Sequence, residues 1–319
     1  MIPLRKTILS RLFLTLFLFL SATSSPLWPT DKIEGVEGSP GHFRAGDLPF
    51  IGGDRESGGG IVPESIEADR EGNLYVIDAQ GASLMKYGPD GVSSWRIDGG
   101  EWGGGGFLMP REIGVSSGLL IYLLDIGRRE IFQINNRGEI IGIVAEERVE
   151  DPRAIAMAGS GKLVIYDGST SEVSILSPTG SLLWSFQPAG FHGRSRVRMA
   201  LKGEEELCLY TRGSAILRIY YFMGGLKRAW EPVLPGGEKL LSISSVSFDE
   251  QGRAYVLDDR LPGLFLFDGL GNLLLDMRES LKDVGFEGPG DVRPSGSFLY
   301  LADTRKGSIF RFPIPSGEP

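Results

Sequence analysis

The sequence has 319 residues, with 33 lysine and arginine residues against 41 aspartate and glutamate residues, and a formal net charge of −8. This acidic balance argues against a nucleic-acid partner, because proteins that bind nucleic acids usually carry a basic footprint. The single cysteine, Cys208, excludes an intrachain disulfide. A lone cysteine within an apolar run is expected to be a small buried side chain rather than a nucleophile.

Residues 1–24 are predicted to be a signal peptide. Arg5, Lys6 and Arg11 form a basic segment, residues 12–20 form an apolar segment, and small residues for cleavage follow at Ala22 and Ser24. The apolar segment is shorter than the roughly 20 residues that span a membrane, although an uncleaved anchor is the alternative. The sequence therefore predicts an exported protein, periplasmic or extracellular, without a stable membrane span after cleavage.

Residues 25–319 are predicted to form a single domain, because one sequence pattern recurs through most of this range. Residues 43–63 interrupt the pattern and include a Gly-rich stretch at 52–60. Such a stretch is typical of a flexible loop insertion, and a lid is the alternative interpretation.

The recurring pattern is first seen as GNLYVID at residues 72–78. Its apolar run closes at Asp78, and the later copies close at Asp125, Asp167, Thr211, Asp258 and Asp303. These positions lie 42–47 residues apart, and a period of this length is typical of repeat architectures. The repeated aspartates are predicted to be mostly structural, because a short acceptor side chain can hold the backbone of the loop that follows.

Each copy contains three further predicted strands. A second apolar run, such as residues 83–87, precedes a tight turn rich in Gly, Pro and Asn. The next strand carries Trp95, Trp184 or Trp230 in three of the copies, and a shorter strand precedes each GNLYVID-type run. Six copies of four short strands predict an all-β, six-bladed β-propeller with four-stranded blades. We expect this closed ring to be a monomer.

The last copy lacks its fourth strand, because only Pro-rich and polar residues follow Phe312. Residues 32–37 have the spacing of the missing outer strand relative to Phe43. We therefore predict that this N-terminal strand completes the last blade, which would pair a strand edge that is otherwise exposed.

The repeats resemble those of the NHL-repeat family. The resemblance lies in Pro63, Pro110, Pro152 and Pro289 ahead of the first strands, in the G-x-LYV-x-D run, and in the Gly-Phe pairs at 106–107 and 285–286. It extends over roughly residues 30–312. The resemblance implies that ligands bind on the face where each first strand begins. It does not select an activity, because the family contains scaffolds, sensors, binding proteins and a few enzymes.

Two enzyme chemistries found on six-bladed propellers can be compared with these residues. The amidating lyase of the NHL group holds zinc with several histidines, and this chain has only His42 and His192. Gluconolactonase-like propellers hold a divalent cation with oxygen ligands, which Glu64, Glu112 and Asp291 could supply, but nearby arginines would oppose a cation. We expect no catalytic residue, metal or cofactor, and a metal-dependent lactonase- or lyase-type enzyme is the alternative.

The predicted mouth of the ring is rich in arginine. The candidate ligand-binding residues there are Arg111, Arg153, Arg196, Glu64, Glu112 and Asp291. Loops after the repeated aspartates add Arg128, Arg129 and Arg212 to the same face. Guanidinium groups match carboxylate or phosphate, and a basic patch on an acidic protein attracts anions. We predict a binding or interaction module for an unidentified protein, peptide or anionic glycan. The alternative is that these arginines pair with neighbouring acids and stabilise the rim.

Overall fold

The computed structural model describes residues 50–52, 60–99, 106–144, 149–193 and 196–314. The predicted signal peptide, the predicted strand at 32–37 and most of the Gly-rich insertion lie outside these residues. Within them, no helix combines the length and the apolar character that a membrane crossing requires.

The strands fall into four sets according to their position in the repeat. The first strands are β1 (Pro63–Ala68), β5 (Pro110–Val115), β9 (Pro152–Met157), β13 (Val197–Lys202), β17 (Ile243–Phe248) and β21 (Pro289–Ser295). The second strands are β2 (Leu74–Asp78), β6 (Ile121–Asp125), β10 (Leu163–Asp167), β14 (Glu206–Thr211), β18 (Ala254–Asp258) and β22 (Phe298–Asp303). The third strands are β3 (Ser83–Tyr87), β7 (Glu130–Ile134), β11 (Glu172–Leu176), β15 (Leu217–Tyr221), β19 (Gly263–Phe267) and β23 (Ser308–Pro313). The fourth strands are β4 (Ser93–Ile97), β8 (Ile140–Ile143), β12 (Leu182–Phe186), β16 (Leu226–Trp230) and β20 (Leu273–Asp276).

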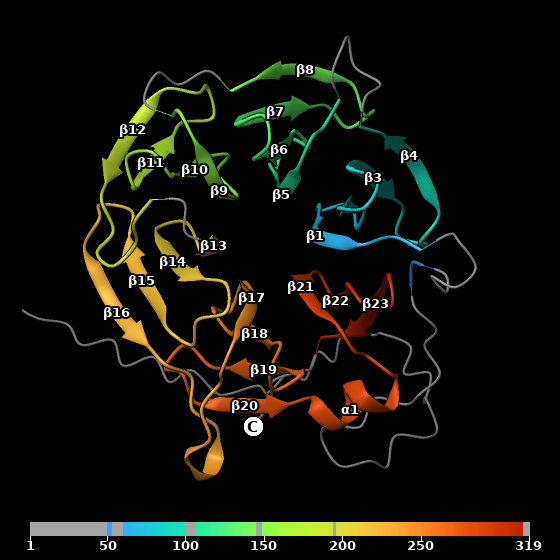
Figure 1. Ribbon diagram of the computed structural model, residues 1–319, viewed down its shortest axis with the longest axis vertical. Coiled ribbons are helices and arrows are strands. Elements are labelled where there is room, and N and C mark those ends of the chain that lie inside the picture. The colour runs from blue at the N-terminus through green and yellow to red at the C-terminus, as the bar shows by residue number, and fades with distance from the viewer. Residues whose placement is uncertain (1–49, 53–59, 100–105, 145–148, 194–195, 315–319) are drawn as a thin grey trace, which may run out of the picture. The chain divides into compact units, whose positions relative to one another are not determined.

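Consecutive strands pair antiparallel to give five four-stranded sheets and one three-stranded sheet, β21-β22-β23, within the described residues. The sheets radiate around a common axis, with the first strand of each innermost (Figure 1). The predicted six-bladed β-propeller is thereby confirmed. We number the blades one to six in chain order, so that β1–β4 form blade one and β21–β23 belong to blade six.

The second strand of each blade is apolar throughout because both of its faces are covered. Side chains of a strand alternate between the two faces of its sheet. In β2, Leu74 and Val76 pack toward blade six, while Tyr75 and Ile77 pack toward blade two. A strand buried on both faces reads as a continuous hydrophobic run, which is why this strand gave the clearest repeat signal.

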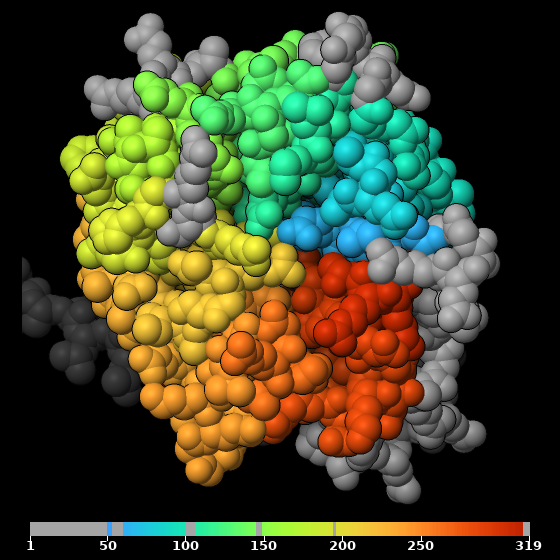
Figure 2. Space-filling view, viewed as in Figure 1, coloured from blue at the N-terminus to red at the C-terminus, as the bar shows by residue number. Residues whose placement is uncertain are grey.

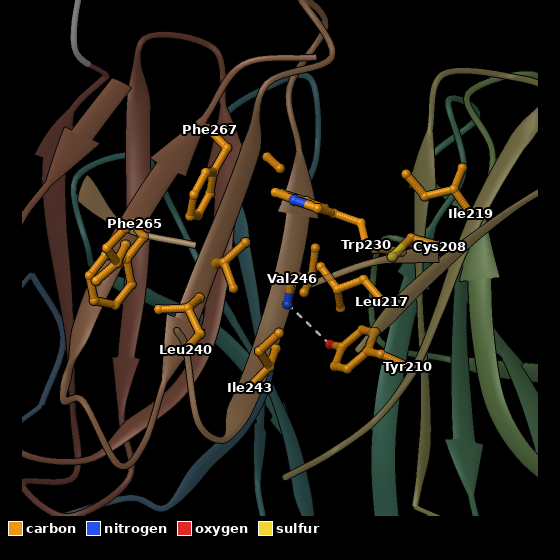
Figure 3. Close-up of a cluster of buried hydrophobic side chains, with 14 residues drawn as sticks. Cys208, Tyr210, Leu217, Ile219, Trp230, Leu240, Ile243, Val246, Phe265 and Phe267 are labelled. Carbon is orange, nitrogen blue, oxygen red and sulfur yellow. Dashed lines mark hydrogen bonds between the residues drawn. The ribbon is translucent and has the colours of Figure 1, made fainter. Parts of the chain in front are cut away.

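Buried hydrophobic clusters fill the interfaces between neighbouring blades. Figure 3 shows the cluster between blades four and five, where Trp230 packs edge-on against Phe267 at a ring-centroid distance of 5.1 Å. In the same interface the Tyr210 hydroxyl accepts a hydrogen bond from the Val246 N–H at 3.1 Å. Cys208 lies in this cluster with 0% exposure, as predicted, and burial raises the pKa of its thiol to about 12.

The N-terminal part of the chain reaches the outer edge of blade six at Ile51. Ile51 and Ile309 of β23 exchange two backbone hydrogen bonds, at 3.2 and 2.8 Å. The Ile51 side chain is buried in the cluster between blades six and one, beside Tyr300. An N-terminal residue thus pairs with the last blade at this one position, while the strand predicted to complete the blade, residues 32–37, lies outside the described part of the chain and stays a prediction.

The described residues include one α-helix that the repeat pattern did not predict. Helix α1 (Arg278–Asp283) follows β20 and leads toward β21, and its Leu281 is buried in the cluster between blades five and six. A short 3₁₀ turn, η2 (Pro235–Gly237), lies between β16 and β17. Both elements are local connections and leave the ring of blades unchanged.

Candidate functional site

The repeated aspartates hold the loops on the face where the inner strands begin. In blade two, one Asp125 oxygen accepts the Leu108 N–H at 2.6 Å, and the other accepts the N–H groups of Met109, Gly127 and Arg128 at 2.9–3.0 Å. Equivalent contacts to backbone N–H groups are made by Asp78, Asp167, Asp258 and Asp303. These contacts confirm the structural role predicted for the aspartates, and they fix the loops that surround the mouth of the channel.

Five of the six inner strands carry a β-bulge at their second residue. The bulged residues are Glu64, Arg111, Arg153, Ser244 and Gly290. A bulge bends its strand and re-aims the side chain of the extra residue. Strand β13 has no bulge, because Val197, Arg198 and Met199 pair in unbroken register with β14. Blade four therefore lacks the extra residue of the bulge, and Arg198 pairs with Tyr210 at the position where Glu112 pairs with Leu124 in blade two.

A cluster of charged side chains bridges the channel. We call the five residues Glu64, Arg111, Glu112, Arg198 and Arg212 the central ion cluster. One oxygen of Glu64, Oε1, lies 2.8 Å from Arg198 Nη2, 3.1 Å from Arg212 Nη1 and 4.0 Å from Arg111 Nη1. Arg198 Nη1 also lies 3.0 Å from Glu112 Oε1. Glu64 belongs to blade one and Arg198 to blade four, so the ion pair joins opposite sides of the ring.

The interior position of this cluster changes the protonation equilibria of its members. Burial alone would lower the pKa of Arg198, but the carboxylates of Glu112 and Glu64 outweigh burial and raise it. Burial raises the pKa of Glu112, and the positive charge of Arg198 offsets part of that effect. Arg198 is therefore held firmly as a cation, and its charge opposes the effect of burial on the pKa of Glu112.

Arg111 is the member of the cluster whose positive charge is least compensated by neighbouring carboxylates. Its side chain is 22% exposed, and among the described residues its guanidinium makes no hydrogen bond, its nearest carboxylate oxygen being that of Glu64 at 4.0 Å. Burial lowers the pKa of Arg111, and the positive charge of Arg198 lowers it further. The cluster contains three guanidinium groups and two carboxylates, so one positive charge is left uncompensated within it.

Glu112 and Asp291 also accept hydrogen bonds from backbone N–H groups. The innermost strands have an open edge toward the channel, whose N–H groups need acceptors. Glu112 Oε2 accepts the Ile155 N–H of the next blade at 2.7 Å. Asp291 Oδ2 accepts the Ile66 N–H of blade one at 2.9 Å, and its other oxygen accepts the Ser245 hydroxyl at 2.6 Å. Both carboxylates thus tie neighbouring blades together, and Asp291 lies outside the central ion cluster.

Arg153 belongs to a second, separate pair on the mouth face. Its Nη2 lies 2.7 Å from one oxygen of Asp151 and 2.9 Å from the other. Arg129 approaches the same carboxylate at 3.6 Å. Here the alternative considered from the sequence, pairing of an arginine with a neighbouring acid, matches the geometry.

Arg196 does not join the residues with which it was grouped. It is exposed just before β13, and within the described residues it takes part in none of the ion pairs of the central ion cluster. The buried position is taken instead by Arg198, two residues further on. The sequence did not mark Arg198 as the buried residue, because the inner strand of blade four has no bulge and lacks the proline that begins four of the other inner strands. Arg212 was expected on this face but not in the site.

A metal site would need a group of histidine, cysteine or carboxylate side chains close together. His192 is exposed in the loop before β13. Within the described residues, no group of three or more histidine, cysteine, aspartate or glutamate side chains has the arrangement of a metal site.

The fold of this chain is shared by propellers of known structure. The structure of U3-55K matches with a TM-score of 0.60 and 12% identity over 80% of this chain and 96% of that chain. The WD40 repeats of RRP9 match with a TM-score of 0.59 and 12% identity over 79% of this chain and 94% of that chain. A catalytically inactive virginiamycin B lyase from Staphylococcus aureus, solved with quinupristin, matches with a TM-score of 0.53 and 11% identity over 81% and 86%. At these identities the likeness concerns the fold alone. A scan with family models and a search of curated proteins found no match.

Proposed function

We propose that this protein is an exported propeller of the NHL-like type that binds an anionic group, carried by a glycan or a peptide, at the mouth of its channel. The observation that carries the proposal is the state of Arg111, a largely buried guanidinium without a hydrogen bond among the described residues. It stands beside Arg198 and Arg212, whose charges act on it unfavourably. An incoming anion would supply the missing acceptor and neutralise the excess positive charge.

Arg111 and Arg212 are the residues that would contact the ligand. Their side chains are 22% and 20% exposed, whereas that of Arg198 is 9% exposed and already committed to Glu64 and Glu112. Guanidinium groups offer a planar set of donors that fits carboxylate, sulfate and phosphate oxygens. Arg198 would then act as a fixed charge beneath the ligand, positioned by the two carboxylates.

The test is an array of acidic glycans, acidic peptides and their neutral counterparts, probed with the mature chain at low and high salt. Selective binding of acidic members, weakening as salt rises, supports the proposal, because exposed charge attraction is screened by ions. Equal binding of acidic and neutral members, or binding that ignores salt, contradicts it.

A further inference from the structure

The channel contains a chamber on the side of the ring opposite the mouth. This cavity of about 190 Å³ is lined by residues near the ends of all six inner strands. Its wall combines a polar side, formed by Glu67, Ser247 and Arg293, with an apolar side that includes Ile155 and Met199. Figure 2 shows the differently coloured blades meeting around the centre of the ring. The chamber is thus a site built jointly by six blades and separate from the central ion cluster.

The polar side of the chamber presents a donor and an acceptor next to each other. Arg293 donates from Nε to the Ile66 carbonyl at 3.2 Å and from Nη1 to Ser247 Oγ at 3.3 Å, and its Nε lies 3.4 Å from Glu67 Oε1. Its Nη2 lies 3.9 Å from Asp291 Oδ2, beyond hydrogen-bond distance. Glu67 Oε1 accepts the Ala68 N–H at 3.1 Å, and Oε2 has no hydrogen bond among the described residues. One guanidinium edge and one carboxylate oxygen therefore remain available.

The size of the chamber limits the ligand. Its volume of about 190 Å³ lies between the ~150 Å³ of a cavity that holds benzene and the ~300 Å³ at which pockets for drug-sized ligands begin. The side opposite Glu67 and Arg293 carries flexible methionines, Met157 and Met199, which adapt to differently shaped apolar groups. A ligand that fits must be small, with an apolar body and both a positive and a negative group at one end.

A second, larger cavity adjoins the chamber on the same face of the ring. This cavity of about 950 Å³ lies over the turns of blades five, six and one, and it shares Phe248 and Pro294 with the chamber. Its lining includes the charged residues Arg70, Glu71 and Glu250. It would serve as the vestibule through which a small polar-ended molecule enters.

We propose that the chamber binds a free apolar α-amino acid. The ligand carboxylate lies on Arg293 Nη2, its ammonium group lies on Glu67 Oε2, and its side chain packs against the methionine wall. Each charged group of the ligand would then meet an opposite charge on the wall, although Asp291 stands 3.9 Å from Arg293 Nη2 as a second carboxylate. Burial raises the pKa of Glu67, with Arg293 opposing the effect, so a ligand ammonium would favour the carboxylate form that the site needs.

The test is isothermal titration of the mature chain with L-leucine, L-methionine and L-phenylalanine, compared with N-acetyl-L-leucine and L-leucinamide. We expect saturable binding of at least one free amino acid, and at least about tenfold weaker binding when either charged group is capped. The Glu67→Gln variant should lose binding to a similar extent. Glu71→Gln, which alters an exposed carboxylate of the vestibule, is the matched control and should bind as the parent does.

Three outcomes would overturn this proposal. They are the absence of binding for all three amino acids, equally tight binding of the capped derivatives, and unchanged binding by a folded Glu67→Gln variant. The comparison of free and capped ligands uses the unaltered chain. It therefore tests the proposal even if the Glu67→Gln variant fails to fold. Because Arg111 and Arg212 lie at the mouth, their substitution should leave amino-acid binding unchanged, which keeps this test independent of the proposed anion site.

Discussion

Arg198 of blade four and Glu64 of blade one form an ion pair of 2.8 Å across the channel, although 134 residues separate them in the sequence. Most contacts in a propeller join neighbouring blades, so a contact between opposite blades restrains the whole ring. Arg198 binds Glu112 as well, and Glu112 holds the inner strand of blade three. Through these contacts one buried side chain couples four blades and also sets the charge at the mouth.

Removal of Arg198 should destabilise the ring strongly. Arg198→Met leaves Glu112 buried without its cation, and breaking a buried pair in this way costs roughly 3–5 kcal/mol. The double variant Arg198→Met with Glu112→Gln should be less destabilised than the sum of the single variants, because the uncompensated charge is gone. Urea unfolding of all four proteins measures this coupling. Arg196→Met, at an exposed position, is the control and should change stability by no more than about 0.5 kcal/mol. Additive effects would show that the pair is not coupled.

The protein should lose stability in acid when its loop aspartates become protonated. For Asp167, burial would raise the pKa, but hydrogen bonds from Ser169, Asp151 and Thr170 outweigh burial and lower it below the usual value. A carboxyl group with a lowered folded pKa stabilises the protein above its unfolded pKa and loses this contribution as pH falls through the folded pKa. The Asp167→Asn variant should therefore be less stable than the parent near neutral pH, by roughly 1–3 kcal/mol.

Melting temperatures of both proteins between neutral and strongly acidic pH provide the check. The difference between parent and Asp167→Asn should shrink as pH falls below 3.8, the ordinary pKa of an aspartate side chain. A difference that stays constant over this range would show that the charge of Asp167 does not contribute to stability.

Closure of the ring should depend on Ile51. Its side chain is 6% exposed and lies between blades six and one, so Ile51→Ala removes buried methyl groups and should cost roughly 2–5 kcal/mol. Leu270→Ala is the matched control, since Leu270 is 77% exposed and its truncation should have little effect. Urea unfolding measures both variants. Equal stability of the two variants would mean that this segment is dispensable for closure.

Export can be tested on the protein recovered from the cell that produces it. The basic, apolar and small-residue segments of residues 1–24 predict cleavage near Ala22–Ser25. Intact-mass measurement should therefore show a chain that lacks residues 1–20. A mass that includes Met1 would support the alternative of an uncleaved anchor.

The fold was predictable because its physical cause repeats along the chain. The second strand of every blade is buried on both faces, so runs such as residues 74–78 stand out as continuous apolar segments. The loop aspartates repeat for a similar reason, since each holds the same turn. Helix α1 escaped prediction because it occurs in a single connection, where a repeat pattern gives no signal.

The charged site was only partly predictable. Glu64, Arg111 and Glu112 follow a proline that marks the start of a strand, and the structure brings these three together. Blade four has no such proline and no bulge, so the sequence pointed to exposed Arg196 instead of buried Arg198. An apolar run that contains an arginine, as at residues 197–201, is the one signal that could have revealed a buried cation. Pairing across the ring could not be inferred, because it depends on geometry between opposite blades.

The central claim, that the guanidinium groups at the mouth bind an anion, is tested most directly by the affinity of a labelled oligouronate for matched variants. Arg111→Gln with Arg212→Gln removes the two partly exposed guanidinium groups, while Arg196→Gln removes an exposed one outside the cluster. We predict that the double variant remains folded and binds about a hundredfold more weakly than the parent, as expected for the loss of two charge-assisted hydrogen bonds, and that Arg196→Gln binds as the parent does. Equal affinity of the parent and the folded double variant, or equal losses in both variants, would contradict the claim.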